Sequence, residues 1–291
     1  RYGGKMYNLT DLSTIKKLMR EADASFSHSL GQNFLIDPSV CPEMAKECGA
    51  DKESGVLEIG PGIGVLTSEL AKAAKKVVAL EIDTSLLPVL DKTLSDFDNI
   101  KIIQADVMKA DLRQLLMDEF GDMPVYVCAN LPYYITSPVI MRLLEEELRI
   151  KGITVMVQRE AARRFCAEIG SRESGEVTVA TEFYAERKIC FDVPKESFYP
   201  SPKVDSSVMT LTPRDDEKYR PTDRKLFFAI VKAGFGKRRK TLMNALSSDL
   251  NISKDAIRNA LARCSLDENV RIEAVGMRDL VKLSDALYAD R

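Results

Sequence analysis

The stretch Leu57-Glu58-Ile59-Gly60-Pro61-Gly62-Ile63-Gly64 decides the fold of this chain. It ends a short apolar run, residues 55–59, and precedes residues 66–74, whose apolar side chains recur with helical spacing. Glycine at such a junction permits a tight turn and lets the backbone approach a ligand closely. A tight turn without a ligand is one alternative. A nicotinamide dinucleotide site is another, but its GxGxxG pattern requires glycine where this chain has Val65.

Apolar runs alternate with amphipathic segments along the first two thirds of the chain. This alternation predicts a doubly wound, parallel α/β sheet whose strands are buried on both faces. The last two apolar runs are joined by a proline-rich loop that is too short for a crossover helix, so they predict antiparallel pairing at one edge of the sheet. The predicted strands are residues 55–59, 76–81, 100–104, 125–129, 153–158, 188–193 and 208–212.

The pattern is helical throughout after Pro213. We therefore predict two domains. Residues 1–212 form an α/β domain with an N-terminal helical extension, and residues 213–291 form a small all-helical domain. The helices expected in the second domain are residues 223–233, 239–246, 254–264 and 278–290.

Composition argues against several classes of protein. The chain has no run of about 18 apolar residues, and its first residues are polar, so neither a transmembrane helix nor a secretory signal is expected. We expect a cytoplasmic protein. The single histidine, His28, makes a Ser-His-Asp hydrolase a poor candidate. The six cysteines include no CxxC pair, which predicts free thiols and no metal site.

An acidic residue lies at the end of the next predicted strand, and another lies just after the strand that follows. Glu81 lies 21 residues after Gly60, where a carboxylate can accept hydrogen bonds from ribose hydroxyls. Asp106 can accept from an adenine amino group, while Ile82 and Val107 pack on the ring. Either acid alone could be a solvent-exposed strand end, but the carboxyl ends of parallel strands meet at one sheet edge. GxGxG spacing after an acid resembles the S-adenosylmethionine loop of class I methyltransferases, which implies a Rossmann-like fold and that cofactor.

The fourth predicted strand leads into Asn130-Leu131-Pro132-Tyr133. An adenine amino group is a poor nucleophile because its lone pair is delocalised into the ring. The Asn130 side-chain carbonyl and the Leu131 backbone carbonyl, whose direction Pro132 fixes, could accept its two hydrogens and localise that lone pair. Tyr133 offers a face on which the extruded base can stack. A simple proline turn is the alternative. The loop predicts methyl transfer to an adenine amino group, achieved by positioning.

Together these motifs resemble those of the ribosomal RNA adenine dimethyltransferase family, in its bacterial small-subunit form. The resemblance covers residues 25–245 and implies that Phe198 stacks on the target adenine opposite Tyr133, and packing within its loop is the alternative for Phe198. It is carried by Leu30-Gly31-Gln32-Asn33-Phe34-Leu35, the loop 58–64, Glu81-Ile82-Asp83, the stretch 130–134, and Phe198-Tyr199-Pro200-Ser201-Pro202-Lys203-Val204-Asp205. The cofactor contacts that it implies are Gln32, Asn33, Leu35, Gly60, Glu81, Asp106 and Asn130, and we expect Gly62, Ile82 and Val107 to contact the cofactor beside them.

The resemblance also implies a substrate and a cellular role. The family adds two methyl groups to each of two adjacent adenosines in the 3′-terminal hairpin of 16S rRNA, acts on the assembling small (30S) ribosomal subunit, and takes part in ribosome biogenesis. We expect a monomer. Three places depart from the family pattern at surfaces expected to face RNA, and these are His28-Ser29, Gly236 and Ser174-Gly175-Glu176-Val177.

Basic residues are unevenly distributed, although the net charge is only −2. Residues 224–240 contain seven basic and no acidic side chains. Lys237-Arg238-Arg239-Lys240, expected at the start of a helix, is the best candidate for binding RNA phosphates. Arg159, Arg163 and Arg164, on the helix after the fifth strand, form a second candidate. A solvated helix face is the alternative for each cluster.

Four functions compete for this sequence. Small-subunit rRNA dimethylation is the first, and the related large-subunit methylation that confers macrolide resistance is the second. The Asn-Leu-Pro-Tyr-Tyr sequence at 130–134 favours the first, because the second group more often has Asn-Ile-Pro-Tyr/Phe. A DNA adenine methyltransferase would show Asp/Asn-Pro-Pro-Tyr. A non-catalytic assembly factor would be favoured by a degraded motif, and this motif is intact.

Overall fold

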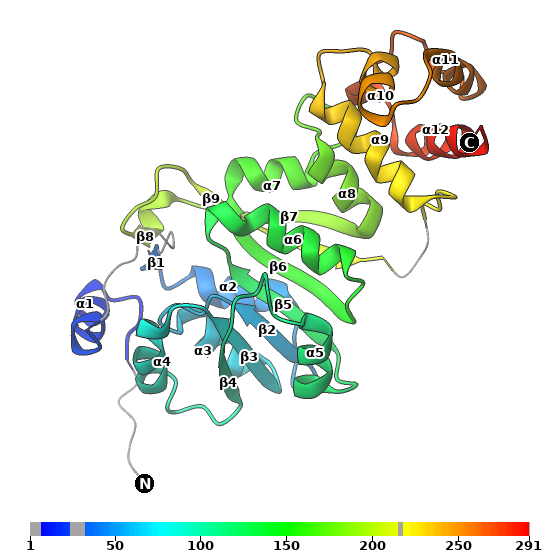
Figure 1. The fold of residues 1–291 in the computed structure, drawn as a ribbon. Helices are drawn as coiled ribbons and strands as arrows, with labels where there is room; N and C mark the ends of the chain where they lie inside the picture. Colours follow the sequence, from blue (N-terminus) through cyan, green and yellow to red (C-terminus); the bar gives the residue numbers. More distant parts are fainter. Residues whose placement is uncertain (1–6, 24–32, 215–217, 291) are drawn as a thin grey trace. The chain divides into compact units, whose positions relative to one another are not determined.

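A computed structural model of the protein describes residues 7–23, 33–214 and 218–290. Its main sheet has seven strands in the order β4-β3-β2-β5-β6-β9-β7 (Figure 1). Strands β4, β3, β2, β5 and β6 are mutually parallel, and β9 runs antiparallel to β6. The predicted parallel sheet is confirmed, and β9 and β7, the two strands expected to pair with each other, are neighbours at one edge of it. The strands are β2 (Gly55–Ile59), β3 (Lys76–Glu81), β4 (Ile100–Gln104), β5 (Val125–Asn130), β6 (Ile150–Gln158), β7 (Ala185–Val193) and β9 (Ser206–Pro213).

Helices cover both faces of this sheet, and two neighbouring residues of β2 show how. Val56 packs in one core with α2 and α3, whereas a Cβ on Gly55 would lie 2.3 Å from the ring of Phe120 in α5. Because successive strand residues point to opposite faces, α5 lies opposite α2 and α3. The helices of this part are α2 (Val40–Cys48), α3 (Val65–Ala73), α4 (Leu87–Thr93), α5 (Leu112–Phe120), α6 (Thr136–Glu145) and α7 (Arg159–Cys166).

The N-terminal extension packs against the glycine loop. Helix α1 (Leu12–Glu21) begins at the N-cap Asp11, whose carboxylate accepts the Thr14 N–H at 2.8 Å. Such a cap satisfies a backbone donor that the first helical turn leaves unbonded. The buried face of α1 includes Ile15, which shares a core cluster with Ile63.

Two segments far apart in the sequence form a separate two-stranded sheet. β1 (Phe34–Leu35) pairs antiparallel with β8 (Phe198–Tyr199), and Leu35 lies opposite Phe198. One more backbone hydrogen bond extends this pairing, because the Ile36 N–H donates to the Ser197 carbonyl at 2.8 Å. It therefore brings together the two motifs that lie at opposite ends of the α/β part of the sequence.

The chain divides into two compact units, residues 1–162 with 187–213, and residues 163–186 with 214–291. The second unit is helical, and its core joins α8 to the later helices. Phe183 of α8 packs on Phe227 of α9 with ring centroids 5.4 Å apart. The helices of this unit besides the end of α7 are α8 (Glu176–Tyr184), α9 (Arg224–Gly236), α10 (Leu242–Leu250), α11 (Lys254–Arg263) and α12 (Met277–Ala289).

This division differs from the sequence-based one, which assigned residues 163–186 to the α/β domain. Val179 and Phe183 form the apolar face of α8, and they are buried against α9. The contact joins segments about 50 residues apart in sequence, so no local pattern indicates it. Within the described ranges, no helix has both the length and the apolar character needed to span a bilayer.

The segment 237–240 is also placed differently from the prediction. It follows the end of α9 and precedes α10, which begins only at Leu242. Thr241 is the N-cap of α10, and its hydroxyl accepts the Asn244 N–H at 3.3 Å. A threonine satisfies this role far better than an arginine or lysine, whose side chains carry no acceptor. The expectation that 237–240 start a helix was therefore wrong.

Candidate active site

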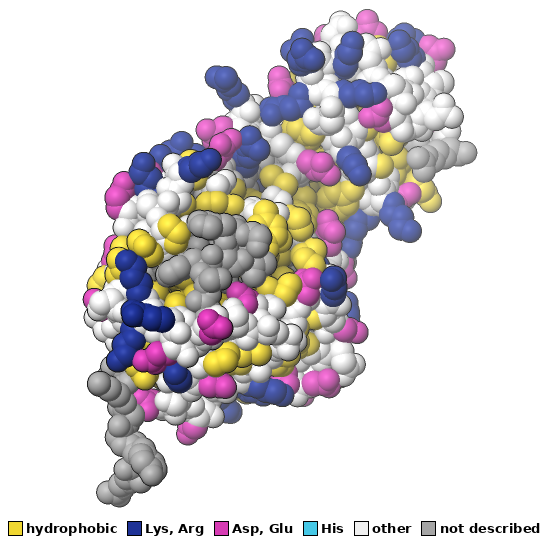
Figure 2. Space-filling view, turned by 60° about the vertical axis from the view of Figure 1, so that its left-hand side comes forward, with side chains coloured by type: hydrophobic (Ala, Val, Ile, Leu, Met, Phe, Trp, Pro, Cys, Tyr) yellow, Lys and Arg dark blue, Asp and Glu magenta, His cyan; other side chains and the backbone are white. Residues whose placement is uncertain are grey.

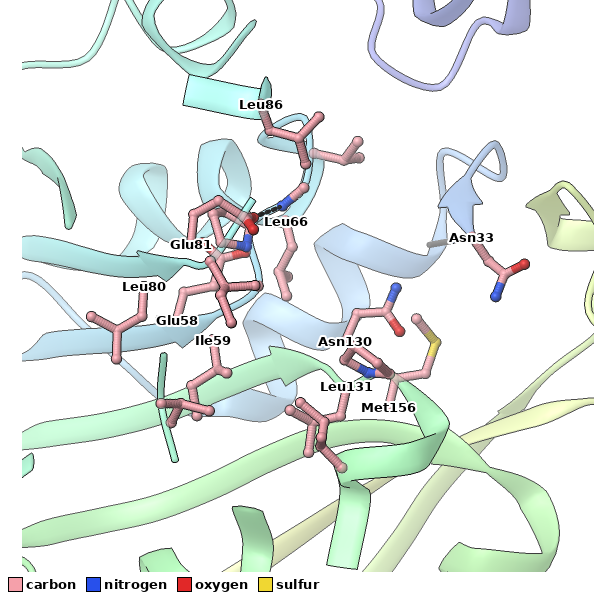
Figure 3. Close-up of a pocket in the computed structure, with 18 of the residues that line it drawn as sticks. Asn33, Glu58, Ile59, Leu66, Leu80, Glu81, Leu86, Asn130, Leu131 and Met156 are labelled. Atoms are coloured by element: carbon pink, nitrogen blue, oxygen red, sulfur yellow. Dashed lines mark hydrogen bonds between the residues drawn. The ribbon is translucent and has the colours of Figure 1, made fainter. Parts of the chain in front are cut away.

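A cavity of about 280 Å³ is lined by residues at the carboxyl ends of β2, β3, β4 and β5 (Figure 3). This edge is where open α/β sheets bind ligands. Every predicted cofactor or catalytic residue that the structure describes lines it. They are Asn33, Leu35, Gly60, Gly62, Glu81, Ile82, Asp106, Val107, Asn130, Leu131, Pro132, Tyr133 and Phe198. Gln32 and His28 lie outside the described residues.

The glycine loop joins β2 to α3. Gly60 has a φ of 72°, and a Cβ built there would find no atom within 4 Å. Gly64 has a φ of 92°, and a Cβ there would lie 2.9 Å from the Leu94 side chain. Both positive φ values favour glycine. The surroundings of the two glycines differ. Gly64 allows close packing within the protein, whereas the open space beside Gly60 lets a ligand reach the backbone.

Glu81 ends β3 next to this loop. Its two carboxylate oxygens accept the Gly62 N–H at 3.3 Å (Figure 3) and the Asp83 N–H at 2.8 Å. Burial raises the pKa of the Glu81 carboxyl, and these backbone hydrogen bonds oppose the rise. Each oxygen has a further lone pair, so the carboxylate can also accept hydrogen bonds from neighbouring hydroxyl groups of a ligand.

Glu58 is a second buried carboxyl in the cavity wall. Its Oε2 atom has no hydrogen-bond partner among the described residues. Burial raises the pKa of Glu58 to about 8, and the negative charge of Glu81 acts in the same direction. The Thr67 hydroxyl opposes this rise, and burial on balance favours the protonated form of Glu58 when the cavity contains no cation. The sequence places this residue in the loop motif, but only the fold shows that it is enclosed.

The loop after β4 contributes Asp106 and Val107. Asp106 accepts the Met108 N–H at 2.9 Å, which fixes the carboxylate beside the cavity. Val107 is buried, whereas Ile82 lines the same cavity with 52% of its surface exposed. Apolar side chains and a carboxylate in one place suit a flat, amino-bearing ring such as adenine.

The Asn130–Tyr133 loop closes the opposite side, where the side chains of Asn130 and Asn33 lie across the cavity from Glu58 and Glu81 (Figure 3). The Leu131 N–H donates to the Met156 carbonyl at 3.2 Å. Pro132, with φ of −55° and ψ of 138°, follows directly. The hydrogen bond and the proline restrain the loop backbone, as two aligned acceptors require.

Two aromatic residues line the cavity near this loop. The hydroxyl of Tyr133 lies 3.2 Å from the Ser206 hydroxyl, and burial raises the pKa of Tyr133, so it stays protonated. Phe198 is 4% exposed and packs in the core with Leu35. Tyr134 follows in the chain and is 60% exposed. Tyr134 also lines the cavity, and the sequence-based prediction did not include it. An aromatic residue directly after Tyr133 could have indicated this place.

Several of the basic residues predicted to bind RNA form ion pairs within the protein. Lys237 forms an ion pair with Asp249, and Arg238 pairs with Glu273 at 3.3 Å. Arg239 and Lys240 are exposed. On the face shown in Figure 2, Lys and Arg side chains stand singly or in small groups with acidic side chains among them.

The second basic cluster is similar. Arg159 pairs with Asp205 at 3.0 Å, and its N–H donates to the Asp205 carbonyl at 3.0 Å. This residue therefore fixes the loop that follows β8. Arg163 and Arg164 are exposed on α7. Within the part of the chain that the structure describes, no group of histidine, cysteine and acidic side chains could hold a metal ion.

A positively charged methyl donor fits this cavity. Glu58, Glu81 and Asp106 line it, Gly60 leaves space at the backbone, and Glu58 has an acceptor oxygen without a partner among the described residues. Cys41, buried at its wall, was not predicted from the sequence. The Rossmann-like sheet, the glycine loop and the acids at successive strand ends define a class I methyltransferase.

Comparisons with known proteins identify the family. The sequence profile described as "Ribosomal RNA adenine dimethylase" matches residues 24–288. "Ribosomal RNA small subunit methyltransferase A" of Bacillus licheniformis is 46% identical over 276 residues, covering 94% of each chain. The protein with the same description from Clostridioides difficile is 40% identical over 282 residues, covering 97% of this chain and 98% of that one. The chain belongs to the ribosomal RNA adenine dimethylase family.

Solved structures agree with this fold. The crystal structure of the 23S rRNA methyltransferase ErmE has a TM-score of 0.68 and 27% identity, and covers 88% of this chain and 100% of that one. A dimethyladenosine transferase from Plasmodium falciparum has a TM-score of 0.69 and 24% identity, and covers 86% of this chain and 95% of that one. The family match and the curated relatives show that this chain is an rRNA adenine methyltransferase.

Proposed function

We propose that this chain transfers methyl groups from S-adenosylmethionine to the exocyclic amino groups of two adjacent adenosines in the 3′-terminal hairpin of 16S rRNA. The substrate is the assembling small (30S) ribosomal subunit, on which the chain acts as a cytoplasmic monomer in ribosome biogenesis. One observation carries the proposal, namely that the acidic strand ends and the Asn130–Tyr133 loop line a single cavity. The relatives named for the small subunit support the choice of substrate.

Several residues have distinct roles in holding the cofactor. Glu81 accepts the ribose hydroxyls, Asp106 accepts the adenine amino group, and Ile82 and Val107 pack on the ring. The N-terminal motif Gln32–Leu35 and the glycine loop contact the remainder. When bound, the cofactor supplies a methyl group that its sulfonium already activates, so no strong base is needed to start the reaction.

The target base is held by the loop after β5. The Oδ1 of Asn130 and the carbonyl of Leu131 accept the two amino hydrogens, which draws the nitrogen lone pair out of the ring. Tyr133 and Phe198 stack on either face of the base. The exposed basic residues on α7 and around Arg239 bind phosphates. Because acceptors are fixed before the base arrives, little reorganisation is needed at the moment of transfer.

The test is transfer of tritiated methyl groups from S-adenosylmethionine to small subunits that lack dimethyladenosine, compared with large subunits and free DNA. Two methyl groups on each of two adenosines in the small subunit, with no label elsewhere, is the expected result. Mapping the label to the 3′-terminal hairpin completes the assignment.

A second candidate function is methylation of the large subunit, because ErmE has the same fold at 27% identity. Label in 23S rRNA alone would establish that function instead. Cofactor binding without label in any substrate would show that the chain is a non-catalytic assembly factor.

A further inference from the structure

A partly buried arginine outside the cavity bonds directly to one of the cavity loops. Arg142 lies on α6, and its side chain is 18% exposed. Its guanidinium donates to two backbone carbonyls, those of Val107 and, at 2.7 Å, Ala110. Its Nε donates to the Glu146 carboxylate one turn later in the chain. The three donations fix the guanidinium plane.

The loop that receives these bonds is the one that lines the adenine side of the cavity. Within it, the N–H groups of Lys109 and Ala110 both donate to the Asp106 carbonyl at 2.9 Å. These internal bonds close the turn, while the Val107 and Ala110 carbonyls bond to Arg142. A guanidinium presents several donors in one plane, so it can hold two carbonyls at once, whereas an ammonium acts as a point charge.

The same helix is bonded to the catalytic loop at its other end. Thr136 is the first residue of α6, and its hydroxyl donates to the Pro132 carbonyl at 3.3 Å. Helix α6 therefore contacts the Asn130–Tyr133 loop through Thr136 and the Asp106–Ala110 loop through Arg142. A hydrogen-bonded helix is rigid over this length, so it can set the spacing of the two loops.

We propose that Arg142 is a positioning residue that holds the Asp106–Val107 loop in register with the Asn130–Tyr133 loop, and thereby sets the cofactor's adenine relative to the target base. This rests on the proposed function in one respect, the assignment of Asp106 and Val107 to the adenine. Replacing Arg142 should loosen the adenine side of the cavity and leave the RNA-facing surface unchanged.

The chain offers a matched control on the neighbouring helix. Arg113 of α5 donates to the Glu146 carbonyl at 2.7 Å and does not line the cavity. It is an arginine bonded to the same end of α6, but its guanidinium holds the backbone of Glu146 rather than a cavity loop. A purely structural role for this region predicts similar effects for Arg113→Met and Arg142→Met.

The experiment compares Arg142→Met, Arg142→Lys and Arg113→Met by calorimetric binding of S-adenosylhomocysteine and by steady-state kinetics. We expect Arg142→Met to weaken S-adenosylhomocysteine binding and raise the KM for S-adenosylmethionine about tenfold or more, as loss of charged hydrogen bonds implies. The KM for the small subunit should change by less than about twofold, which is within ordinary context effects. Arg142→Lys should fall between wild type and Arg142→Met, and Arg113→Met should match wild type.

Two results would overturn the proposal. The first is wild-type affinity for S-adenosylhomocysteine in Arg142→Lys and Arg142→Met, even if their melting temperatures fall. The second is an equal loss in Arg113→Met. Because the binding assay contains no RNA, failure of RNA methylation by the wild type would count against the proposed function and not against Arg142. Arg142→Lys keeps the charge, so it tests the proposal even if Arg142→Met does not fold.

Discussion

The cavity residues and the basic segments of this chain were both predicted from short sequence patterns. The two sets differ in how closely the structure follows the prediction. The cavity collects residues from four strand ends, and every described member of the predicted set lines it. In the segment 237–240, Lys237 and Arg238 are paired with acids of the same unit, and Arg239 and Lys240 are exposed. The glycine-loop pattern specifies a backbone shape, whereas a run of charge specifies no geometry.

The reason lies in what each pattern constrains. A glycine with positive φ after a buried strand fixes where the chain turns, and parallel strands bring their ends to one edge. A lysine or arginine can reach any acid within the range of its long, flexible side chain, so its partner depends on the neighbouring helix. Substitutions at four places test this contrast, and their expected effects decrease from Asn130 to Glu58.

Asn130→Ala should abolish most of the activity. Removing one preorganised hydrogen-bonding group from a reacting centre lowers turnover by roughly 100- to 1,000-fold. The readout is the rate of tritiated methyl transfer to small subunits. Far-ultraviolet circular dichroism and subunit binding should match wild type, because the Asn130 side chain points into the cavity. Turnover at the normal rate would remove the acceptor role.

Glu81→Gln should act on cofactor affinity instead. The amide keeps one acceptor oxygen but loses the charge, which weakens binding by roughly tenfold to 100-fold. The KM for S-adenosylmethionine measures this loss, and kcat should change less. Glu43→Gln, on the exposed face of α2, is the matched control and should behave as wild type. An unchanged KM in Glu81→Gln would place the ribose elsewhere.

Charge reversal separates the paired from the exposed basic residues. Arg239→Glu combined with Lys240→Glu should weaken subunit binding and reduce its salt dependence by about one unit of slope per lost phosphate contact. Lys237→Glu should affect binding less and stability more, because it places a negative charge beside Asp249. Binding titrations at several salt concentrations measure the slope. Equal effects of the two reversals would mean that ion pairing within the protein does not decide which residues bind RNA.

Glu58→Gln should change how stability depends on pH. The pKa of Glu58 is about 8 in the folded protein against an ordinary value of 4.5, so between these values the folded state holds one proton more than the unfolded state. The free energy of unfolding therefore falls as pH rises through this window and levels off above it. Glutamine removes that slope, so the variant should melt a few degrees higher than wild type at about pH 9 and gain less at about pH 5. Calorimetry without cofactor measures it, and a constant difference across pH would contradict the assignment.

The strands of the main sheet were predictable because their apolar runs are continuous and their turns carry glycine or proline. The structure extends some of them, for example β6, which begins at Ile150 rather than 153. Helix α5 was not predicted, and neither was α8, because a short amphipathic segment gives a weak periodic signal. The residues that line the cavity were predicted more fully than the helices, since most of them lie at a strand end or a glycine turn, whereas Leu35 and Phe198, which lie in β1 and β8, came only from the resemblance.

By itself, the sequence determined the alternation of strands and helices, the glycine turn, and the set of acids and amides that must meet at one sheet edge. These follow from local spacing, because the period of side chains and the conformations open to glycine and proline are properties of a few adjacent residues. Only the tertiary structure decided the pairing of β1 with β8, the place of α8 beside α9, and the partner of Arg142. Those contacts join residues distant in sequence, and which atoms meet depends on how the buried faces pack.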